Sequence, residues 1–248
     1  MSENKRFRSI YMLFISLVLS LIMLGIHGRA LAGVNEQQYV NEGFSLILPE
    51  NWEEIPYSVV KDYEKALNET IAKGHEQAYA HAFKLKYAKE PFEYPNILIQ
   101  ITKNGKIPIR QLEKIKNYDF NKTNDTIEKQ TQHLISQINI NEQVYDSQSQ
   151  IIWLKTTAVV QGENIQGISA IIPTEHGYIQ MNYSSLASVS HKYEGDFLAI
   201  VNSVKISDAE RYKTNWFQGV FTHKMLMESI LYAVIAMGIA FILKIRKN

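Results

Sequence analysis

Alternating apolar and polar positions predict β-strands in the middle of the chain. The predicted strands cover 44–48, 79–87, 96–102, 151–160, 165–172 and 178–183. Pro49 ends the first strand because proline cannot donate to a strand ladder. The second strand places Phe83 and Leu85 on one face and two lysines on the other, so it is expected to be half-exposed. Short polar turns separate the last three strands, which predicts an antiparallel meander.

Helical spacing of apolar residues predicts three helices among these strands. The stripes are Val60, Tyr63, Leu67 and Ile71; Ile127, Leu134, Ile135 and Ile138; and Phe197, Ile200, Val201 and Val204. Gly74 is expected to end the first helix and Ser190 to cap the last. The middle helix, over 122–138, has a polar surface that is either solvated or a partner-docking face. The fold class is therefore α+β: an α/β/α sandwich with helices packed on a largely antiparallel sheet.

The N-terminus has the three parts of a secretory signal. Basic residues at Lys5-Arg6-Phe7-Arg8 precede an uncharged run from Ser9 to Ile26, and the small residues Ala30 and Ala32 follow. This pattern predicts cleavage after Ala32. The apolar run is also just long enough to span a bilayer, so retention as a signal anchor is the alternative.

The C-terminus carries a second apolar segment, from Met225 to Leu243. As a helix it would be roughly 28 Å long, which is close to the hydrocarbon thickness of a bilayer. Lys244, Arg246 and Lys247 follow directly, and positive charge beside a span marks the cytoplasmic side. The sequence therefore predicts a single transmembrane helix with a cytoplasmic tail and an extracytoplasmic domain before it.

These segments predict a protein of the inner (cytoplasmic) membrane whose domain faces the periplasm or exterior. The predicted divisions are 1–32, signal peptide or anchor; 33–207, extracytoplasmic domain; 208–224, juxtamembrane segment; 225–243, transmembrane helix; and 244–248, basic tail.

Composition excludes several classes of protein chemistry. The 248 residues contain no cysteine, so disulfides, thiolate zinc sites, iron–sulfur clusters and cysteine nucleophiles are excluded. Residues 33–224 hold 19 basic and 23 acidic residues, a balance that gives no electrostatic footprint for nucleic acid. We also find no nucleophile elbow, phosphate-binding glycine loop or zinc-protease motif. No cofactor is predicted.

Two short motifs lie at the two ends of the middle domain. The first runs from Glu42 to Trp52 and contains a Gly-Phe strand, a proline and a tryptophan; the second runs from Phe197 to Ile206. Both motifs resemble those of PsbP/Mog1/DcrB-like domains. The resemblance covers about 33–207 and implies an α/β/α sandwich around an antiparallel sheet. It implies no shared enzymatic activity and no catalytic residue to carry over. An insertion-like stretch at about 117–142 departs from the group.

The predicted function is a membrane-anchored binding or scaffolding module of the bacterial cell envelope, without catalysis. Its expected partners are the membrane, through the C-terminal helix, and an envelope protein. Trp52 and Tyr94 are candidate partner contacts, although burial beneath a helix and packing within a loop are the structural alternatives.

An enzyme or a carrier is the alternative function. A metal-dependent hydrolase would use His75, Glu76 and His81 with a further ligand. A small-ligand or lipid-binding protein would need an apolar pocket beneath the sheet. Glu53 and Glu54 are adjacent on a strand and should point to opposite faces, which disfavours an acid/base pair.

Overall fold

A computed structural model describes residues 37–41, 43–70, 78–114, 135–160 and 162–213. All of these belong to one compact unit, Glu36–Asn248. The predicted signal segment, the predicted transmembrane helix and its basic tail lie outside the described residues. Within the described part of the chain, no helix is long and apolar enough to cross a membrane.

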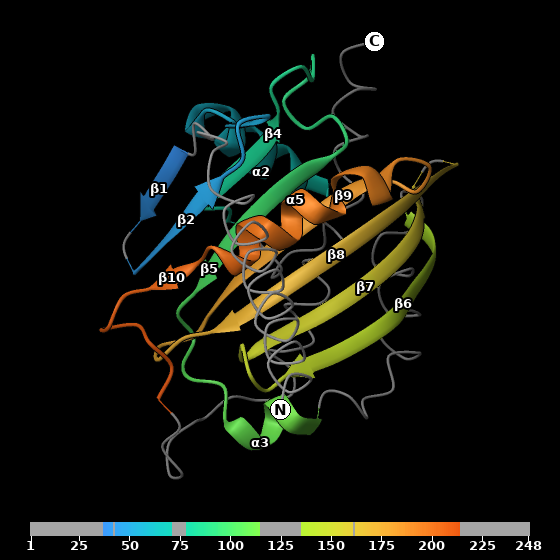
Figure 1. Cartoon of the computed structure of the whole chain (residues 1–248). Coiled ribbons are helices and arrows are strands. Elements are labelled where there is room, and N and C mark those ends of the chain that lie inside the picture. The colour runs from blue at the N-terminus through green and yellow to red at the C-terminus, as the bar shows by residue number, and fades with distance from the viewer. Residues whose placement is uncertain (1–36, 42, 71–77, 115–134, 161, 214–248) are drawn as a thin grey trace, which may run out of the picture. The chain divides into compact units, whose positions relative to one another are not determined.

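Two antiparallel sheets form the framework (Figure 1). The smaller has the order β1-β2-β10, with strands Gln37–Asn41, Phe44–Leu48 and Lys205–Ile206. The larger has the order β3-β4-β5-β9-β8-β7-β6. Its strands, in chain order, are Trp52–Glu54, His81–Leu85, Asn96–Thr102, Ile135–Asp146, Ile151–Val160, Glu163–Pro173 and Tyr178–Leu186. The predicted meander of β7, β8 and β9 is confirmed.

Helices lie on both faces of the larger sheet, and its central strands β5 and β9 are buried on both sides. Helix α5, Ser190–Asn202, packs on the face that carries Ile97, Ile99 and Met181, and Figure 1 shows it crossing in front of the strands. Helix α2, Tyr57–Thr70, packs on the opposite face with Leu98. The short helix α3, Ile109–Lys114, joins a third cluster. The mixed α+β prediction with an antiparallel sheet is confirmed.

The prediction of a helix over 122–138 is wrong at its C-terminal end. Residues 115–134 lie outside the described residues, and Ile135 begins strand β6. Gln137 has a φ of 51°, and the pairing with β7 shifts between Ser136 and Asn139. This bulge lets Ile135 and Ile138 enter the same core cluster although they are three residues apart. A strand irregularity thus imitates helical spacing.

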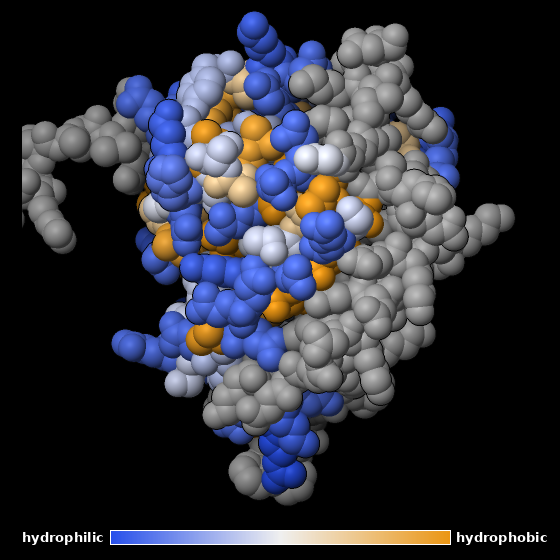
Figure 2. All heavy atoms as spheres, turned by 90° about the vertical axis from the view of Figure 1, so that its right-hand side faces the viewer, coloured by the Kyte–Doolittle hydropathy of each residue, from blue (hydrophilic) through white to orange (hydrophobic). Residues whose placement is uncertain are grey.

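Strand β6 is one edge of the larger sheet, and its irregularities have a physical use there. Register shifts twist and interrupt an edge, which protects it from unwanted pairing. Figure 2 views the molecule from the side that lies to the right in Figure 1, the side of β6. Polar residues predominate on its described surface, with apolar patches between them.

Two local predictions are corrected as well. Val189, rather than Ser190, is the N-cap of α5, and it makes no side-chain capping bond; Ser190 is the buried first residue of the helix. The predicted strand 79–87 is shorter, His81–Leu85, and it is not half-exposed, because Ala82 is buried beneath α2 while Phe83 is buried on the other face.

Candidate functional site

Trp52 lies in the interior and ties the larger sheet to α5. Its side chain is 0% exposed, and its indole Nε1 donates to Asp196 Oδ2 at 2.9 Å. Asn51 Nδ2 donates to the same oxygen at 2.8 Å. A fully buried indole presents no surface to a partner, which corrects the prediction of a partner contact through Trp52. Of its two predicted roles, the structure supports burial beneath a helix.

Tyr94, the second candidate contact, is half-buried in the connection between β4 and β5. It packs against the cluster beneath α2, and burial raises the pKa of its hydroxyl well above the usual range. The exposed aromatic residue of this connection is Tyr87, which is 64% exposed. The sequence therefore pointed to the right loop, but the tyrosine that this loop exposes is Tyr87 and not Tyr94.

Tyr87 belongs to a group that we call the aromatic surface cluster: Asn51, Tyr87, Lys192, Tyr193 and Asp196. The Tyr87 and Tyr193 hydroxyls are hydrogen-bonded, and Lys192 Nζ lies 4.9 Å from the centre of the Tyr193 ring. Hydrogen bonding by Lys192 lowers the pKa of Tyr193. The pKa of Tyr87 is instead raised to about 12, mainly because the Tyr87 hydroxyl is partly removed from water. The cluster combines an exposed aromatic ring, a cation and a carboxylate that holds Asn51 and Trp52.

The residues considered for a metal site are not gathered into one. His75 and Glu76 lie outside the described residues, and His81 Nδ1 lies 2.6 Å from Glu54 Oε1. Among the residues that the structure describes, no group of three potential ligands is present. Glu53 instead pairs with Lys84 at 3.3 Å. The adjacent glutamates therefore have different partners, as expected for neighbours on a strand.

A second polar group, which sequence reasoning missed, begins at the turn between β8 and β9. A Cβ atom on Gly177 would lie 1.8 Å from the carbonyl oxygen of Thr102, so only glycine allows this turn to approach β5. The approach lets the Gly105 N–H donate to the His176 carbonyl at 2.9 Å. It also brings Lys106 Nζ to 2.7 Å from Glu175 Oε2, with the Lys106 side chain 7% exposed.

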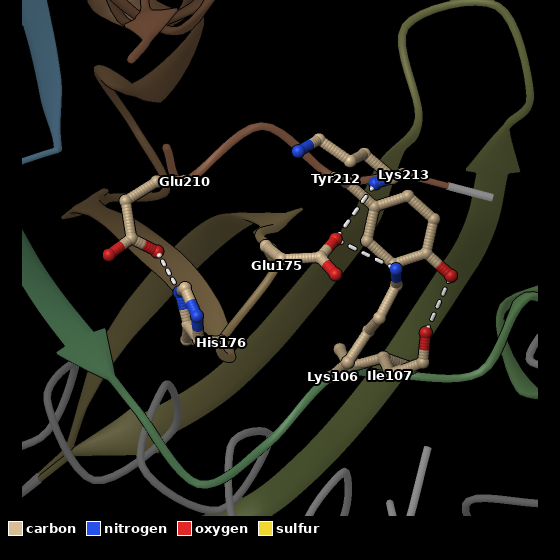
Figure 3. A network of polar contacts seen from close by, with 7 residues as sticks. All are labelled: Lys106, Ile107, Glu175, His176, Glu210, Tyr212 and Lys213. Carbon is tan, nitrogen blue, oxygen red and sulfur yellow. Dashed lines mark hydrogen bonds and ion pairs between the residues drawn. The ribbon is translucent and has the colours of Figure 1, made fainter. Parts of the chain in front are cut away.

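Tyr212 and Lys213 close over this ion pair (Figure 3). The Tyr212 hydroxyl donates to the Ile107 carbonyl at 2.6 Å, and Lys106 Nζ lies 5.0 Å from the centre of its ring. The Lys213 N–H donates to Glu175 Oε2 at 3.1 Å. The hydrogen bond from Lys106 is the main reason that the pKa of Glu175 is lowered.

The turn between β8 and β9 also holds the residues that precede Tyr212 in the chain. The Glu175 N–H donates to the Glu210 carbonyl at 2.9 Å, and Glu210 Oε2 lies 3.0 Å from His176 Nδ1. Further back, the Ser207 N–H donates to the Gly43 carbonyl at 2.8 Å. We call these contacts the exit network, because they attach 207–213, the last described residues, to both sheets.

A polar stripe also lies buried on the face of the larger sheet that carries α2 and α3. Its members are Asn96, Gln100, Thr156, Ser169, Gln180, Asn182 and Ser184, and all are buried. Asn182 Oδ1 accepts from Ser169 Oγ at 2.8 Å and from Gln180 Nε2 at 3.0 Å. In the sequence of β9, polar residues alternate with apolar ones, a pattern typical of a strand with one solvent-facing side. The fold shows that the polar side and the apolar side of β9 are both buried.

Comparison with known proteins gives structural likeness alone. No family model and no curated protein matches the chain. Among solved structures, it is similar to PsbP (CyanoP) of Synechocystis sp. PCC 6803, with 12% identity over 72% of this chain and 96% of that one and a TM-score of 0.48. It is also similar to LpqN of Mycobacterium tuberculosis, described as involved in cell envelope biogenesis, with 11% identity over 71% and 92% and a TM-score of 0.39.

A protein of Bacteroides thetaiotaomicron matches with 12% identity over 71% of this chain and a TM-score of 0.36; the match spans 50% of that protein's length. CyanoP and LpqN have folds of the PsbP/Mog1/DcrB-like group that the two motifs resemble, and the likeness is one of structure alone. Identities near 12% and TM-scores below 0.5 carry no activity or partner over to this chain.

Proposed function

We propose that this protein is a membrane-tethered, extracytoplasmic binding module of the bacterial cell envelope, and that it performs no catalysis. The exit network is the observation that carries the proposal. It attaches residues 207–213 to the domain through backbone hydrogen bonds and a buried ion pair, so that the last described residues are held in a fixed position. A fixed exit is what a domain needs if it is to be held in one orientation by the segment that follows.

The connection between the domain and the C-terminal apolar segment is short. Eleven residues, 214–224, separate Lys213 from the start of the apolar segment at Met225. Even a fully extended stretch of this length spans only roughly 40 Å. If Met225 to Leu243 crosses the bilayer, the domain is held close to the membrane surface.

Cysteine labelling tests this topology, because the chain contains no native cysteine. Ser188→Cys introduces a single thiol at an exposed position of the domain, and Asn248→Cys introduces one at the C-terminus. In intact spheroplasts, a membrane-impermeant maleimide is expected to label the first variant and to label the second only after permeabilisation. Release of the protein by alkaline carbonate, or the reverse labelling pattern, contradicts the proposal.

We further propose that the aromatic surface cluster contacts an envelope protein. The exposed Tyr87 ring supplies apolar area and a polar edge, which is why tyrosine is favoured in interfaces. A photocrosslinking amino acid at position 87 is expected to yield a defined adduct in cells. Tyr57, 60% exposed at the start of α2, is the control position. Equal adducts from both positions, or none from position 87, contradict a contact at the cluster.

A further inference from the structure

Exposed cations gather around the last described residues of the domain, 207–213. We define the exit end as residues 103–114, 174–177 and 205–213, with the turn between β6 and β7 beside them. Tyr212, Ile107, Leu112 and Tyr178 share one core cluster, against which Tyr145 of β6 packs. Backbone hydrogen bonds from Gly105 to His176 and from Glu175 to Glu210 join the three segments. The exposed cations of the exit end are Lys103, Arg110, Lys114, Lys205, Arg211 and Lys213. Its exposed acids are Glu113 and Asp208.

The exit network explains this excess, because it turns other acids inward. The Glu175 and Glu210 side chains are only 21% and 20% exposed, and they accept from Lys106, Lys213 N–H and His176. Asp146 is likewise occupied by its own turn, accepting from Ser149 Oγ at 2.6 Å. Figure 3 shows the Lys213 side chain extending away from the Glu175 carboxylate.

At the exit end, acidic neighbours lie beside Arg211 and Lys103. Arg211 lies 2.9 Å from Asp208, and Lys103 lies 4.0 Å from Glu210. Both pairs are surface pairs, which are weak and leave the cations accessible. Elsewhere in the described chain the balance reverses, since eight exposed acids accompany five exposed lysines. The positive surface is therefore local to the exit end.

We propose that the exit end rests on the anionic phospholipid headgroups of the membrane into which the C-terminal segment inserts. The inference depends on the proposed tethering. A short tether keeps the exit end at a high effective concentration beside the bilayer, so weak contacts suffice for docking. Each Lys or Arg near an anionic surface favours contact by roughly fivefold, and the attraction acts within a Debye length of about 8 Å.

This orientation also places the aromatic surface cluster away from the bilayer. Strand β5 runs from Asn96, which follows the loop carrying Tyr87, to Thr102 at the exit end. Its seven residues span roughly 20 Å. Docking by the exit end thus leaves the cluster exposed to the envelope, where the proposed partner would be.

Fluorescence energy transfer in nanodiscs tests the docking with the full-length chain. Single cysteines at Asn104, in the exit end, and Ser188, near the aromatic surface cluster, carry the donor, and headgroup-labelled lipid carries the acceptor. In discs containing phosphatidylglycerol, transfer is expected to be stronger from position 104 than from position 188. It should fall at high salt and in discs of phosphatidylcholine alone.

Charge-matched variants distinguish the exit end from cations elsewhere. Arg110→Gln/Lys114→Gln/Lys213→Gln removes three exposed cations of the exit end, and Lys65→Gln/Lys86→Gln/Lys89→Gln removes three from the rest of the surface. The first triple variant is expected to lower the ratio of docked to undocked protein by about 100-fold, and the second to leave it nearly unchanged. Thermal unfolding followed by circular dichroism verifies that both remain folded.

The outcomes separate the two proposals. A chain that fails to insert into discs overturns the tethering, and the docking with it. A chain that inserts, but whose transfer from position 104 is independent of lipid charge or falls equally in both triple variants, overturns the docking alone. Transfer that is stronger from position 188 than from position 104 would show that the opposite end faces the lipid.

Discussion

The buried ion pair between Lys106 and Glu175 should respond unequally to removal of either partner. Glu175→Gln leaves the ammonium of Lys106 almost enclosed, with its side chain 7% exposed and no anion at 2.7 Å. Breaking a buried pair in this way costs about 3–5 kcal/mol. We expect roughly 3 kcal/mol here, because the amide oxygen of the introduced glutamine can still accept one hydrogen bond.

Removing the cation instead should cost less. In Lys106→Met the Glu175 carboxylate is 21% exposed and keeps the hydrogen bond from the Lys213 N–H at 3.1 Å. The methionine side chain would still pack beneath the Tyr212 ring, so we expect a loss of about 1 kcal/mol. The double variant replaces both charges by neutral groups and should lie within about 1 kcal/mol of the wild type, since no uncompensated charge remains buried.

Urea unfolding followed by tryptophan fluorescence measures all four free energies, because Trp52 lies in the main core cluster and Trp153 packs against it. The expected result is strong non-additivity: the double variant is more stable than Glu175→Gln alone. Equal losses in the two single variants, or a double variant that loses the sum of both, would refute the reasoning that Lys106 is the buried charge of the pair.

Three further outcomes follow from particular contacts. Trp52→Phe should lower the unfolding free energy by about 1–2 kcal/mol, because α5 loses an indole donor at 2.9 Å. Gly177→Ala should prevent normal folding, as judged by soluble yield, since its Cβ would lie 1.8 Å from a backbone oxygen of Thr102; Gly195→Ala, with open space around it, is the control and should be neutral or stabilising. The pKa of Glu175 is lowered in the folded protein, so its carboxylate stabilises the fold fully at a pH above 4.5, the ordinary pKa of the group. This contribution to the unfolding free energy is lost as the pH falls through the folded-state pKa.

Each of these outcomes has a contrary result. Unchanged stability of Trp52→Phe would show that the indole hydrogen bond contributes nothing, and equal yields of Gly177→Ala and Gly195→Ala would show that the turn can retreat from β5. For the acid dependence, stability curves of the wild type and Glu175→Gln should converge at low pH. Parallel curves down to the acid transition would contradict a role for the Glu175 carboxylate.

Most of the strands could be predicted from the sequence because each depends on local alternation. The boundaries of β2, β5 and β7 agree with the predicted ones, and Pro49 follows the first of them directly. Strand β6 could not be predicted, because its bulge depends on pairing with β7 and places Ile135 and Ile138 at a spacing typical of a helix.

The candidate site was less accessible to prediction than the strands. The sequence pointed to Trp52 and to the loop of Tyr94, but exposure is a property of packing, and packing buries Trp52 and leaves Tyr87 outside. The exit network could not be foreseen at all. Its residues come from three segments, around Lys106, Glu175 and Tyr212, with no shared motif.

By itself, then, the sequence determined the α+β class and the meander, because local periodicity and turn residues are sufficient for these. Runs of apolar residues in the sequence also predict the membrane segments, which stay a prediction. Only the tertiary structure decided which residues meet. Gly177 illustrates the reason: nothing in its neighbours indicates a special role, and its need to be glycine arises from Thr102, which is far away in the chain but adjacent in the sheet. Contacts of that kind are set by strand order and register, which long-range packing selects.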